Sequence, residues 1–229
     1  MYSHSLTRIA ALVAALVVAG CSGILAGPTA MTHDGLQQVP SNNFDAVYRK
    51  PAVDMSAYQA IGIAPCSVAF RNNWLRDQNR DRLDLSNRVT QQDVDRIKDQ
   101  LSTACEEQFR KALSRDPAYN VVEDFSDGES VLVLHPSIID LNINAPDVRS
   151  ATRSTSYTTS AGEMTLSLDL VDATTNEVLG RVVDRKRAMD TRRLQWTNSV
   201  TNTAETNRML RRWADLLREG LDELRAGNQ

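Results

Sequence analysis

Cysteine offers more chemistry than any other residue type in this sequence, because a thiol can be acylated, oxidised to a disulfide or bound to a metal ion. The first of the three cysteines, Cys21, closely follows an apolar run over residues 9–19, which is itself preceded by Arg8. A membrane-spanning helix needs about 20 apolar residues, so this run is too short to span a bilayer. Its length and flanks instead predict a secretory signal peptide.

The signal peptide ends in the small residues Val18, Ala19 and Gly20, directly before Cys21. This pattern resembles the lipobox of bacterial lipoproteins, in which a peptidase cuts before the cysteine and the thiol is diacylated. The resemblance implies a signal peptide over 1–20 and a membrane anchor of three acyl chains, palmitate among them, which hold a protein stably. Ser22 in place of aspartate favours the outer membrane by resemblance to enterobacterial sorting. The alternative is an ordinary signal peptide with a chance cysteine.

The other two cysteines, Cys66 and Cys105, form an even pair in an exported protein. Cys66 lies near the end of a predicted strand, and Cys105 lies on the apolar face of a predicted helix. A disulfide between them would close a loop of about 40 residues and stabilise the fold by about 3–4 kcal/mol. Two buried free thiols are the alternative. No further ligands stand beside these cysteines at suitable spacing, so we expect no metal and no cofactor.

A catalytic group is not evident among the acidic and histidine residues. The sequence lacks the G-x-S-x-G, H-E-x-x-H, P-loop and Rossmann motifs. His135 is the only histidine within the expected domain, and strand alternation places it on the opposite face from Asp140. Asp169, Asp172 and Asp184 could supply the paired carboxylates of a glycosidase-like site, but turns and surfaces supply such pairs routinely. We therefore expect a non-catalytic domain.

Basic residues are concentrated near the carboxyl end of the chain. Between residues 181 and 218 there are ten basic residues and four acidic ones. The members proposed as an anionic-partner patch are Arg181, Arg185, Lys186, Arg187, Arg192 and Arg193, and Arg208, Arg211, Arg212 and Arg218 extend it along the last helix. Such a surface would bind phospholipid headgroups or an acidic protein. An ordinary solvated surface is the alternative.

Hydrophobic periodicity indicates the elements that carry these residues. Residues 21–43, rich in Gly, Pro, Ser and Asn, predict a lipidated cysteine followed by a flexible linker. Residues 44–229 predict a single periplasmic domain, with a helix that begins after Thr90 and a second helix from about 199 to 224. Strands are expected near residues 58–70, 121, 131–143, 164–170 and 178–189. The fold class is therefore α+β: a two-layer sandwich of two main helices on a mostly antiparallel sheet of about five strands.

Three stretches of the sequence resemble a known family. They are "FDAVYRKPAVDMSAYQAIGIAPCSVAF", "VVEDFSDGESVLVLHPSIIDL" and "LVDATTNEVLGRVVD". Together they are similar to an uncharacterised family of proteobacterial lipoproteins, domain of unknown function 3313, over residues 35 to 225. The resemblance implies a lipoprotein but no catalytic residues, because none is assigned in that family.

The formal net charge of −3 gives no indication of a nucleic-acid partner. The expected function is a membrane-anchored lipoprotein whose periplasmic domain binds or scaffolds another envelope component, a protein partner among them. One alternative is an enzyme that acts on envelope material. Another alternative is a subunit of an outer-membrane secretion or assembly complex.

Overall fold

The computed structural model describes residues 31–51, 53–80, 82–85, 88–125, 130–143, 156–158, 162–187, 195–197 and 199–226. Cys21 and the predicted signal peptide lie outside these ranges. The strands are β1 (Gln37–Val39), β2 (Ala46–Arg49), β3 (Ala60–Ile63), β4 (Ser67–Phe70), β5 (Val121–Val122), β6 (Val131–Asn142), β7 (Ser156–Thr158), β8 (Glu163–Asp172), β9 (Val178–Arg187) and β10 (Gln195–Thr197). The helices are the 3-10 turn η1 (Met55–Ala57), α1 (Trp74–Asn79), α2 (Gln91–Leu113) and α3 (Ser199–Ala226).

The main sheet is mixed and has eight strands, in the order β1-β2-β9-β8-β6-β3-β5, with β4 also paired to β6. The α+β class is confirmed, but the expected sheet of about five mostly antiparallel strands is wrong. The antiparallel part consists of β1, β2, β9, β8 and β6, while β3, β4 and β5 join in parallel. The reason is α2, which provides the long crossover that parallel neighbours require.

Pro65 divides the single strand expected near residues 58–70 into β3 and β4. Both pieces pair in parallel with β6, and the backbone N–H of Ala64 still bonds to the carbonyl of Leu134 at 2.9 Å. Proline cannot donate to the sheet, so the ladder is interrupted where it stands. One predicted strand thus becomes two strands on the same neighbour.

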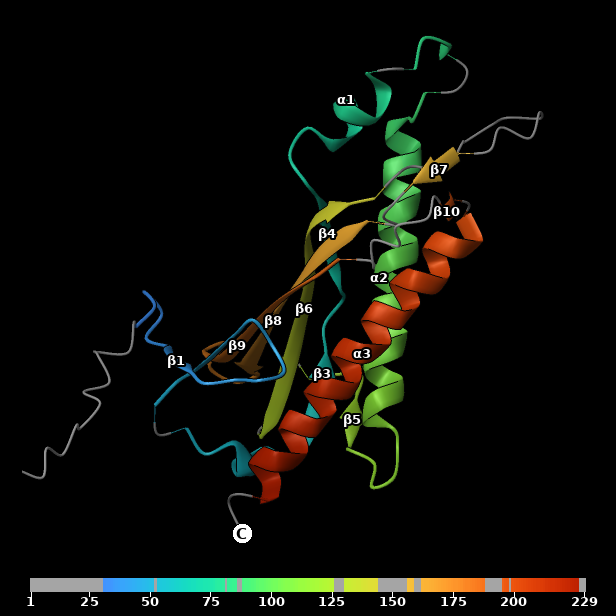
Figure 1. The fold of residues 1–229 in the computed structure, drawn as a ribbon. Coiled ribbons are helices and arrows are strands. Elements are labelled where there is room, and N and C mark those ends of the chain that lie inside the picture. The colour runs from blue at the N-terminus through green and yellow to red at the C-terminus, as the bar shows by residue number, and fades with distance from the viewer. Residues whose placement is uncertain are drawn as a thin grey trace, which may run out of the picture.

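Helices α2 and α3 lie side by side over one face of the sheet (Figure 1). The main core lies between these two helices and the sheet, and its largest fully buried members include Phe109, Leu134, Leu168 and Trp213. Within the described ranges, no helix is long and apolar enough to cross a membrane.

Strand β6 is buried on both faces at its beginning, which explains its unbroken apolar run. Leu132 and Leu134 belong to the core under the helices, whereas Val131 and Val133 belong to a smaller cluster on the other face. Phe125 covers that second face above Gly62, where a Cβ atom would come within 2.5 Å of the phenylalanine ring.

The alternation along β6 does not continue to its end. Asp140 has a left-handed backbone, with φ of 52°, and the pairing with β8 shifts register between Ile139 and Asn142. A bulge of this kind exchanges the two faces of a strand. Leu141 consequently lies in the main core, while Ile139 is 37 % exposed.

Helix α2 begins as its sequence predicts. The hydroxyl of Thr90 accepts from the backbone N–H of Asp93 at 3.2 Å, and the Asp93 carboxylate accepts in return from the backbone N–H of Thr90 at 3.0 Å. These reciprocal bonds form a capping box. The Thr90 hydroxyl also donates to the Asp93 carboxylate at 2.7 Å, and this bond together with the one from the Thr90 backbone N–H lowers the pKa of Asp93 to about 2.

Cys66 and Cys105 are joined by a disulfide, with their Cα atoms 6.3 Å apart. The same segment is held to α2 by two further contacts. The backbone N–H of Cys66 donates to the Glu106 carboxylate at 3.0 Å, and the Ser102 hydroxyl donates to the Cys66 carbonyl at 2.7 Å. The break between β3 and β4 is therefore fastened to the helix that covers it.

The folded part of the chain starts earlier than the expected boundary at residue 44. Leu36 is fully buried, and β1 pairs with β2 in an antiparallel arrangement. The sequence predicts a linker here because residues such as Gly35 and Pro40 interrupt its periodicity. These residues instead bracket a short edge strand, where proline is tolerated.

Candidate functional site

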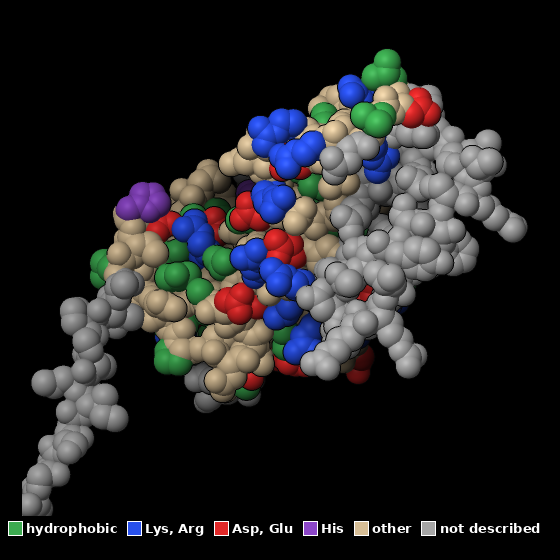
Figure 2. All heavy atoms as spheres, turned by 45° about the horizontal axis from the view of Figure 1, so that its top comes forward, with side chains coloured by type: hydrophobic (Ala, Val, Ile, Leu, Met, Phe, Trp, Pro, Cys, Tyr) green, Lys and Arg blue, Asp and Glu red, His purple; other side chains and the backbone are tan. Residues whose placement is uncertain are grey.

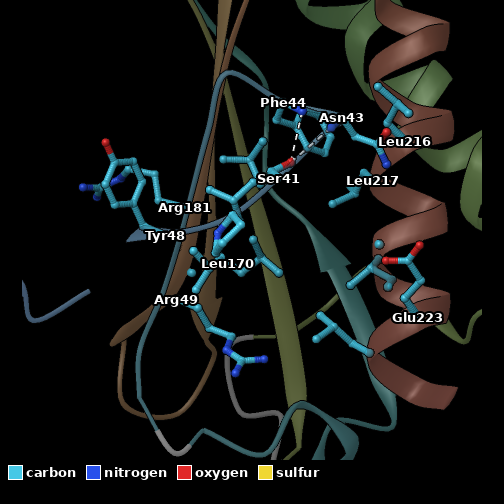
Figure 3. A pocket seen from close by; sticks show the side chains of 18 of the residues that line it. Ser41, Asn43, Phe44, Tyr48, Arg49, Leu170, Arg181, Leu216, Leu217 and Glu223 are labelled. Carbon is cyan, nitrogen blue, oxygen red and sulfur yellow. Dashed lines mark hydrogen bonds between the residues drawn. The ribbon is translucent and has the colours of Figure 1, made fainter. Parts of the chain in front are cut away.

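A cavity of about 530 Å³ lies beside α3, on the helix-covered side of the sheet. It has three walls, formed by the β1–β2 arm, by strands β8 and β9, and by the carboxyl-terminal half of α3 (Figure 3). Its apolar lining consists of Val39, Pro40, Phe44, Val47, Met55, Leu170, Val182, Leu216, Leu217, Leu221 and Leu224. We refer to this cavity as the α3 groove.

The wall opposite α3 is shaped by the connection between β1 and β2. The hydroxyl of Ser41 accepts from the backbone N–H groups of Asn43 and Phe44, each at 3.2 Å (Figure 3). This small turn places Phe44 and Asn43 across from Leu216 and Leu217 of α3. Tyr48 and Arg181 point to the other side of the sheet (Figure 3).

The helical wall of the groove contains Gly220 within a 28-residue helix. Among the residues that the structure describes, a Cβ atom at this position would meet nothing within 4 Å. Glycine in the middle of a helix destabilises it by roughly 0.5–1 kcal/mol relative to alanine. Packing among the described residues therefore does not explain the glycine, whose effect is to widen the groove.

Two opposite charges flank the groove. Arg49 ends β2, and Glu223 lies on α3; both line the cavity and both are exposed. Within the described part of the chain neither side chain has a hydrogen bond or an ion pair. The groove is thus mostly apolar, with Ser41, Asn42 and Asn43 in the wall opposite α3 and with one free cation and one free anion on its rim (Figure 3).

The predicted basic patch is divided between the two faces of β9. Arg185 and Arg187 point away from the helices and both bind Glu163, each at 2.9 Å. The bond from Arg187 lowers the pKa of Glu163 against the opposing effect of its burial. Arg181 on the same face binds Asp169 at 2.6 Å.

Lys186 faces the helices, where its ammonium group binds the Asp184 carboxylate at 2.7 Å. Asp184 is 1 % exposed and also accepts from the indole N–H of Trp213 at 2.5 Å. Arg192 and Arg193 lie outside the described residues. Positive and negative side chains alternate over the surface as a result (Figure 2), and the four described members of the patch are all ion-paired.

Comparison with known proteins identifies the family of this chain. The model of a family described as "Protein of unknown function (DUF3313)" matches residues 22–217. This chain belongs to the DUF3313 family. No curated protein matches it.

Two solved structures are similar to the DUF3313 chain at low levels. A PelC dodecamer from Paraburkholderia phytofirmans has 10% identity and a TM-score of 0.32, with 72% of this chain and 96% of that chain covered. A neuraminyllactose-binding hemagglutinin homolog from Helicobacter pylori has 10% identity and a TM-score of 0.39, with coverages of 75% and 89%. At these values neither likeness carries a conclusion about function.

The three acidic residues considered for a glycosidase-like site of the DUF3313 domain, Asp169, Asp172 and Asp184, do not converge on one cleft. Asp169 binds Arg181 on the helix-free face, whereas Asp184 is buried under α3. Asp172 accepts from the Tyr58 hydroxyl at 2.6 Å, and this bond lowers its pKa. His135 is exposed and lies opposite Asp169 in the sheet.

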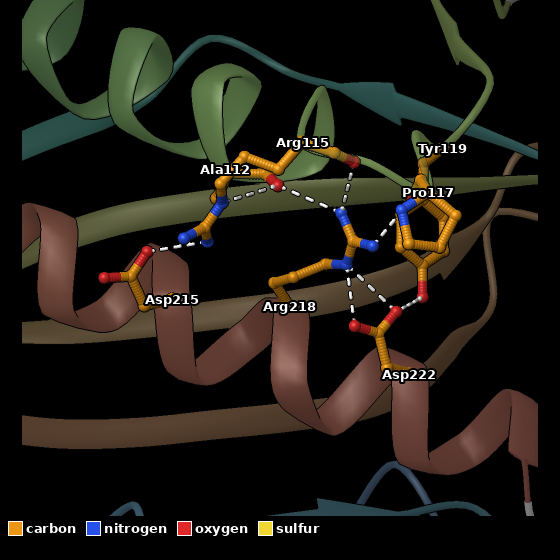
Figure 4. Close-up of polar contacts among 7 residues, drawn as sticks. All are labelled: Ala112, Arg115, Pro117, Tyr119, Asp215, Arg218 and Asp222. Atoms are coloured by element: carbon orange, nitrogen blue, oxygen red, sulfur yellow. Dashed lines mark hydrogen bonds and ion pairs between the residues drawn. The ribbon is translucent and has the colours of Figure 1, made fainter.

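Arg218, expected on the basic surface of the DUF3313 domain, is 6 % exposed (Figure 4). Its guanidinium donates to the carbonyls of Ala112, Arg115 and Pro117 at 3.2, 3.1 and 2.6 Å. It also binds Asp222, which accepts from the Tyr119 hydroxyl at 2.7 Å. Burial, together with the bond to Asp222, raises the pKa of Tyr119 to about 12.

The sequence predicted the α3 face that contains Leu216, Leu217 and Leu224, but it did not predict that this face is only partly covered. Leu216 and Leu224 are half-buried, since the β1–β2 arm stops short of them. The available signal was Gly220, a helix-weakening residue within the apolar stripe. No metal-binding cluster of three or more His, Cys, Asp or Glu side chains occurs in the described ranges.

Proposed function

We propose that this protein is a bacterial envelope lipoprotein, anchored in the outer membrane through acyl chains on Cys21. Its domain lies in the periplasm and binds another envelope component in the α3 groove, without performing catalysis. The observation that carries the proposal is the open apolar groove of about 530 Å³, widened by a glycine that the packing of the chain does not require. Ligand sites are typically cavities of this size with few polar groups.

The position of the groove supports the link between anchor and binding. Its wall begins at Val39, which is 18 residues after Cys21. Even a fully extended chain spans at most about 3.6 Å per residue, so the tether keeps the groove within roughly 65 Å of the membrane surface. Components of that membrane are therefore always near the groove.

Photo-crosslinking in intact envelopes tests the proposal. A photoreactive residue replaces Leu216 in the full-length chain, and the matched control places the same residue at Arg211, which is exposed on α3 away from the groove. We expect an adduct from position 216 that is lost when Gly220→Leu fills the groove. Equal adducts from both positions, or an adduct at position 216 that Gly220→Leu leaves unchanged, would contradict the proposal.

A further inference from the structure

The apolar lining of the α3 groove indicates a ligand whose buried part has no polar groups. Backbone groups in the walls are already bonded: β2 pairs with β1 on one side and with β9 on the other, and Ser41 accepts from the two N–H groups of the adjoining turn. An extended peptide in the groove would find few partners for its own N–H and C=O groups, and burying them unpaired is costly. An acyl chain has none to satisfy.

The rim of the groove indicates the charge of the part that stays in water. Arg49 carries an unpaired guanidinium, a group whose planar fork matches the oxygens of a phosphate. Glu223 carries an unpaired carboxylate on the facing helix, and it would repel a purely anionic headgroup but attract an ammonium group (Figure 3). The two charges together are complementary to a zwitterion.

We infer that the α3 groove holds one acyl chain of a zwitterionic phospholipid of the phosphatidylethanolamine type. The phosphate binds Arg49, the ammonium group binds Glu223, and the chain lies along Phe44, Leu217 and Leu224. This inference rests on the proposed function and specifies the envelope component. Gly220 supplies the width that the chain occupies.

A titration with single-chain lipids tests the inference on the chain carrying Cys21→Ser, which lacks its own acylation site. The probes are lysophosphatidylethanolamine, lysophosphatidylglycerol and an uncharged alkyl glucoside, each below its micelle concentration. We expect lysophosphatidylethanolamine to bind most tightly and the glucoside least tightly. Equal binding of all three probes, or no binding of lysophosphatidylethanolamine, would overturn the inference.

Variants locate the binding. Gly220→Leu should weaken binding by about tenfold or more, because a leucine in a packed space displaces what occupies it. Glu219→Leu, which adds the same side chain on the exposed side of α3, is the matched control and should bind normally. Circular dichroism and a urea titration establish that both variants fold. A folded Gly220→Leu variant with unchanged binding would overturn the assignment to the groove.

The two rim residues have separate effects. Arg49→Gln should weaken both phospholipids by about threefold, the usual scale of an exposed ion pair, while Arg211→Gln on the far side of α3 should change neither. Glu223→Gln should remove the preference for lysophosphatidylethanolamine over lysophosphatidylglycerol. A preference that survives Glu223→Gln would overturn the zwitterion assignment.

The two proposals can fail separately. If photo-crosslinking in envelopes gives a protein adduct specific to the α3 groove while no lysolipid binds, the lipid inference is rejected and the proposed function is kept.

Discussion

Gly220 is a residue that weakens its helix but leaves space in the α3 groove. Its neighbour Leu217 is buried, as the helical spacing of the sequence predicts, and Leu221 is buried as well. The glycine itself adds no contact, and alanine would suit the helix better by roughly 0.5–1 kcal/mol. Its presence is explained by the space that it leaves in the α3 groove.

Asp93 provides a prediction at the same scale. Its pKa is lowered to about 2 by bonds from the Thr90 backbone and hydroxyl, so its charge stabilises the folded state at every pH above its ordinary value near 3.8. Protonation removes this stabilisation as the pH falls from about 4 through 2. Asp93→Asn should lower the free energy of unfolding by about 1 kcal/mol at pH 7 and flatten its dependence on pH in the acid range.

Urea titrations of both proteins at pH 7 and at pH 2.5 measure this difference. The matched control is Asp95→Asn, two residues further along α2 at an exposed position. An equal loss of stability with acid in the wild type and in Asp93→Asn would contradict the role of the capping box.

At the scale of elements, local sequence patterns predicted where a helix begins, but they did not predict which distant strands pair. Thr90 and Asp93, three residues apart, predict the start of α2, and the structure confirms it. The parallel pairing of β3 with β6 joins residues about 70 positions apart, and no local pattern encodes it. The face exchange in β6 depends on a positive φ at Asp140, which its sequence context does not announce.

Arg218 joins the two main helices, and this role could not be predicted because an arginine on a helix usually lies in water. Its guanidinium donates to one carbonyl in the last turn of α2 and to two carbonyls that follow the helix, and it binds Asp222 on α3 (Figure 4). Arg218→Met should lower the free energy of unfolding by about 3 kcal/mol, because the buried Ala112 carbonyl and two partly buried carbonyls lose the donor that satisfies them. Arg211→Met, which removes an exposed arginine from the same helix, should change it by less than about 0.5 kcal/mol.

Chemical denaturation of the two variants under identical conditions gives both values. Equal, small effects would show that water replaces the guanidinium and that Arg218 does not hold the helices together.

The disulfide joins the sheet to a helix, because Cys66 lies between β3 and β4 while Cys105 lies on α2. Replacing both cysteines with serine should lower the free energy of unfolding by about 3–4 kcal/mol, through the greater freedom of the unfolded chain. Thiol labelling of the unfolded, unreduced chain carrying Cys21→Ser should detect no free thiol. Labelling of both cysteines would contradict the bond.

At the scale of the whole molecule, the sequence predicted the fold class and the DUF3313 family, and the family match is shown over residues 22–217. It underestimated the sheet because β1 and β2 are only three and four residues long, too short for a periodic signal, and because the strand expected near residues 58–70 is two strands. It also predicted one basic surface from charges that alternate between the two faces of β9. A linear count of charges does not reveal their partners in neighbouring strands.

The anchor is a property of the whole molecule and is tested in cells. Cys21→Ser should leave the protein unprocessed or free of the outer membrane, because the acylated thiol is its proposed attachment. Fractionation of envelopes with and without globomycin measures this distribution. A Cys21→Ser protein of mature size that still fractionates fully with the outer membrane would contradict the lipoprotein assignment.

The central claim is that the α3 groove is where this domain binds a membrane component. Methyl NMR spectra of the chain carrying Cys21→Ser, recorded as lysophosphatidylethanolamine is added, test the location most directly. The account predicts shifts for Leu170, Leu217 and Leu224, which line the groove, with Leu101 and Leu113 of α2 unaffected. Shifts confined to other parts of the domain, or absent at the three groove leucines while the lipid binds, would contradict it.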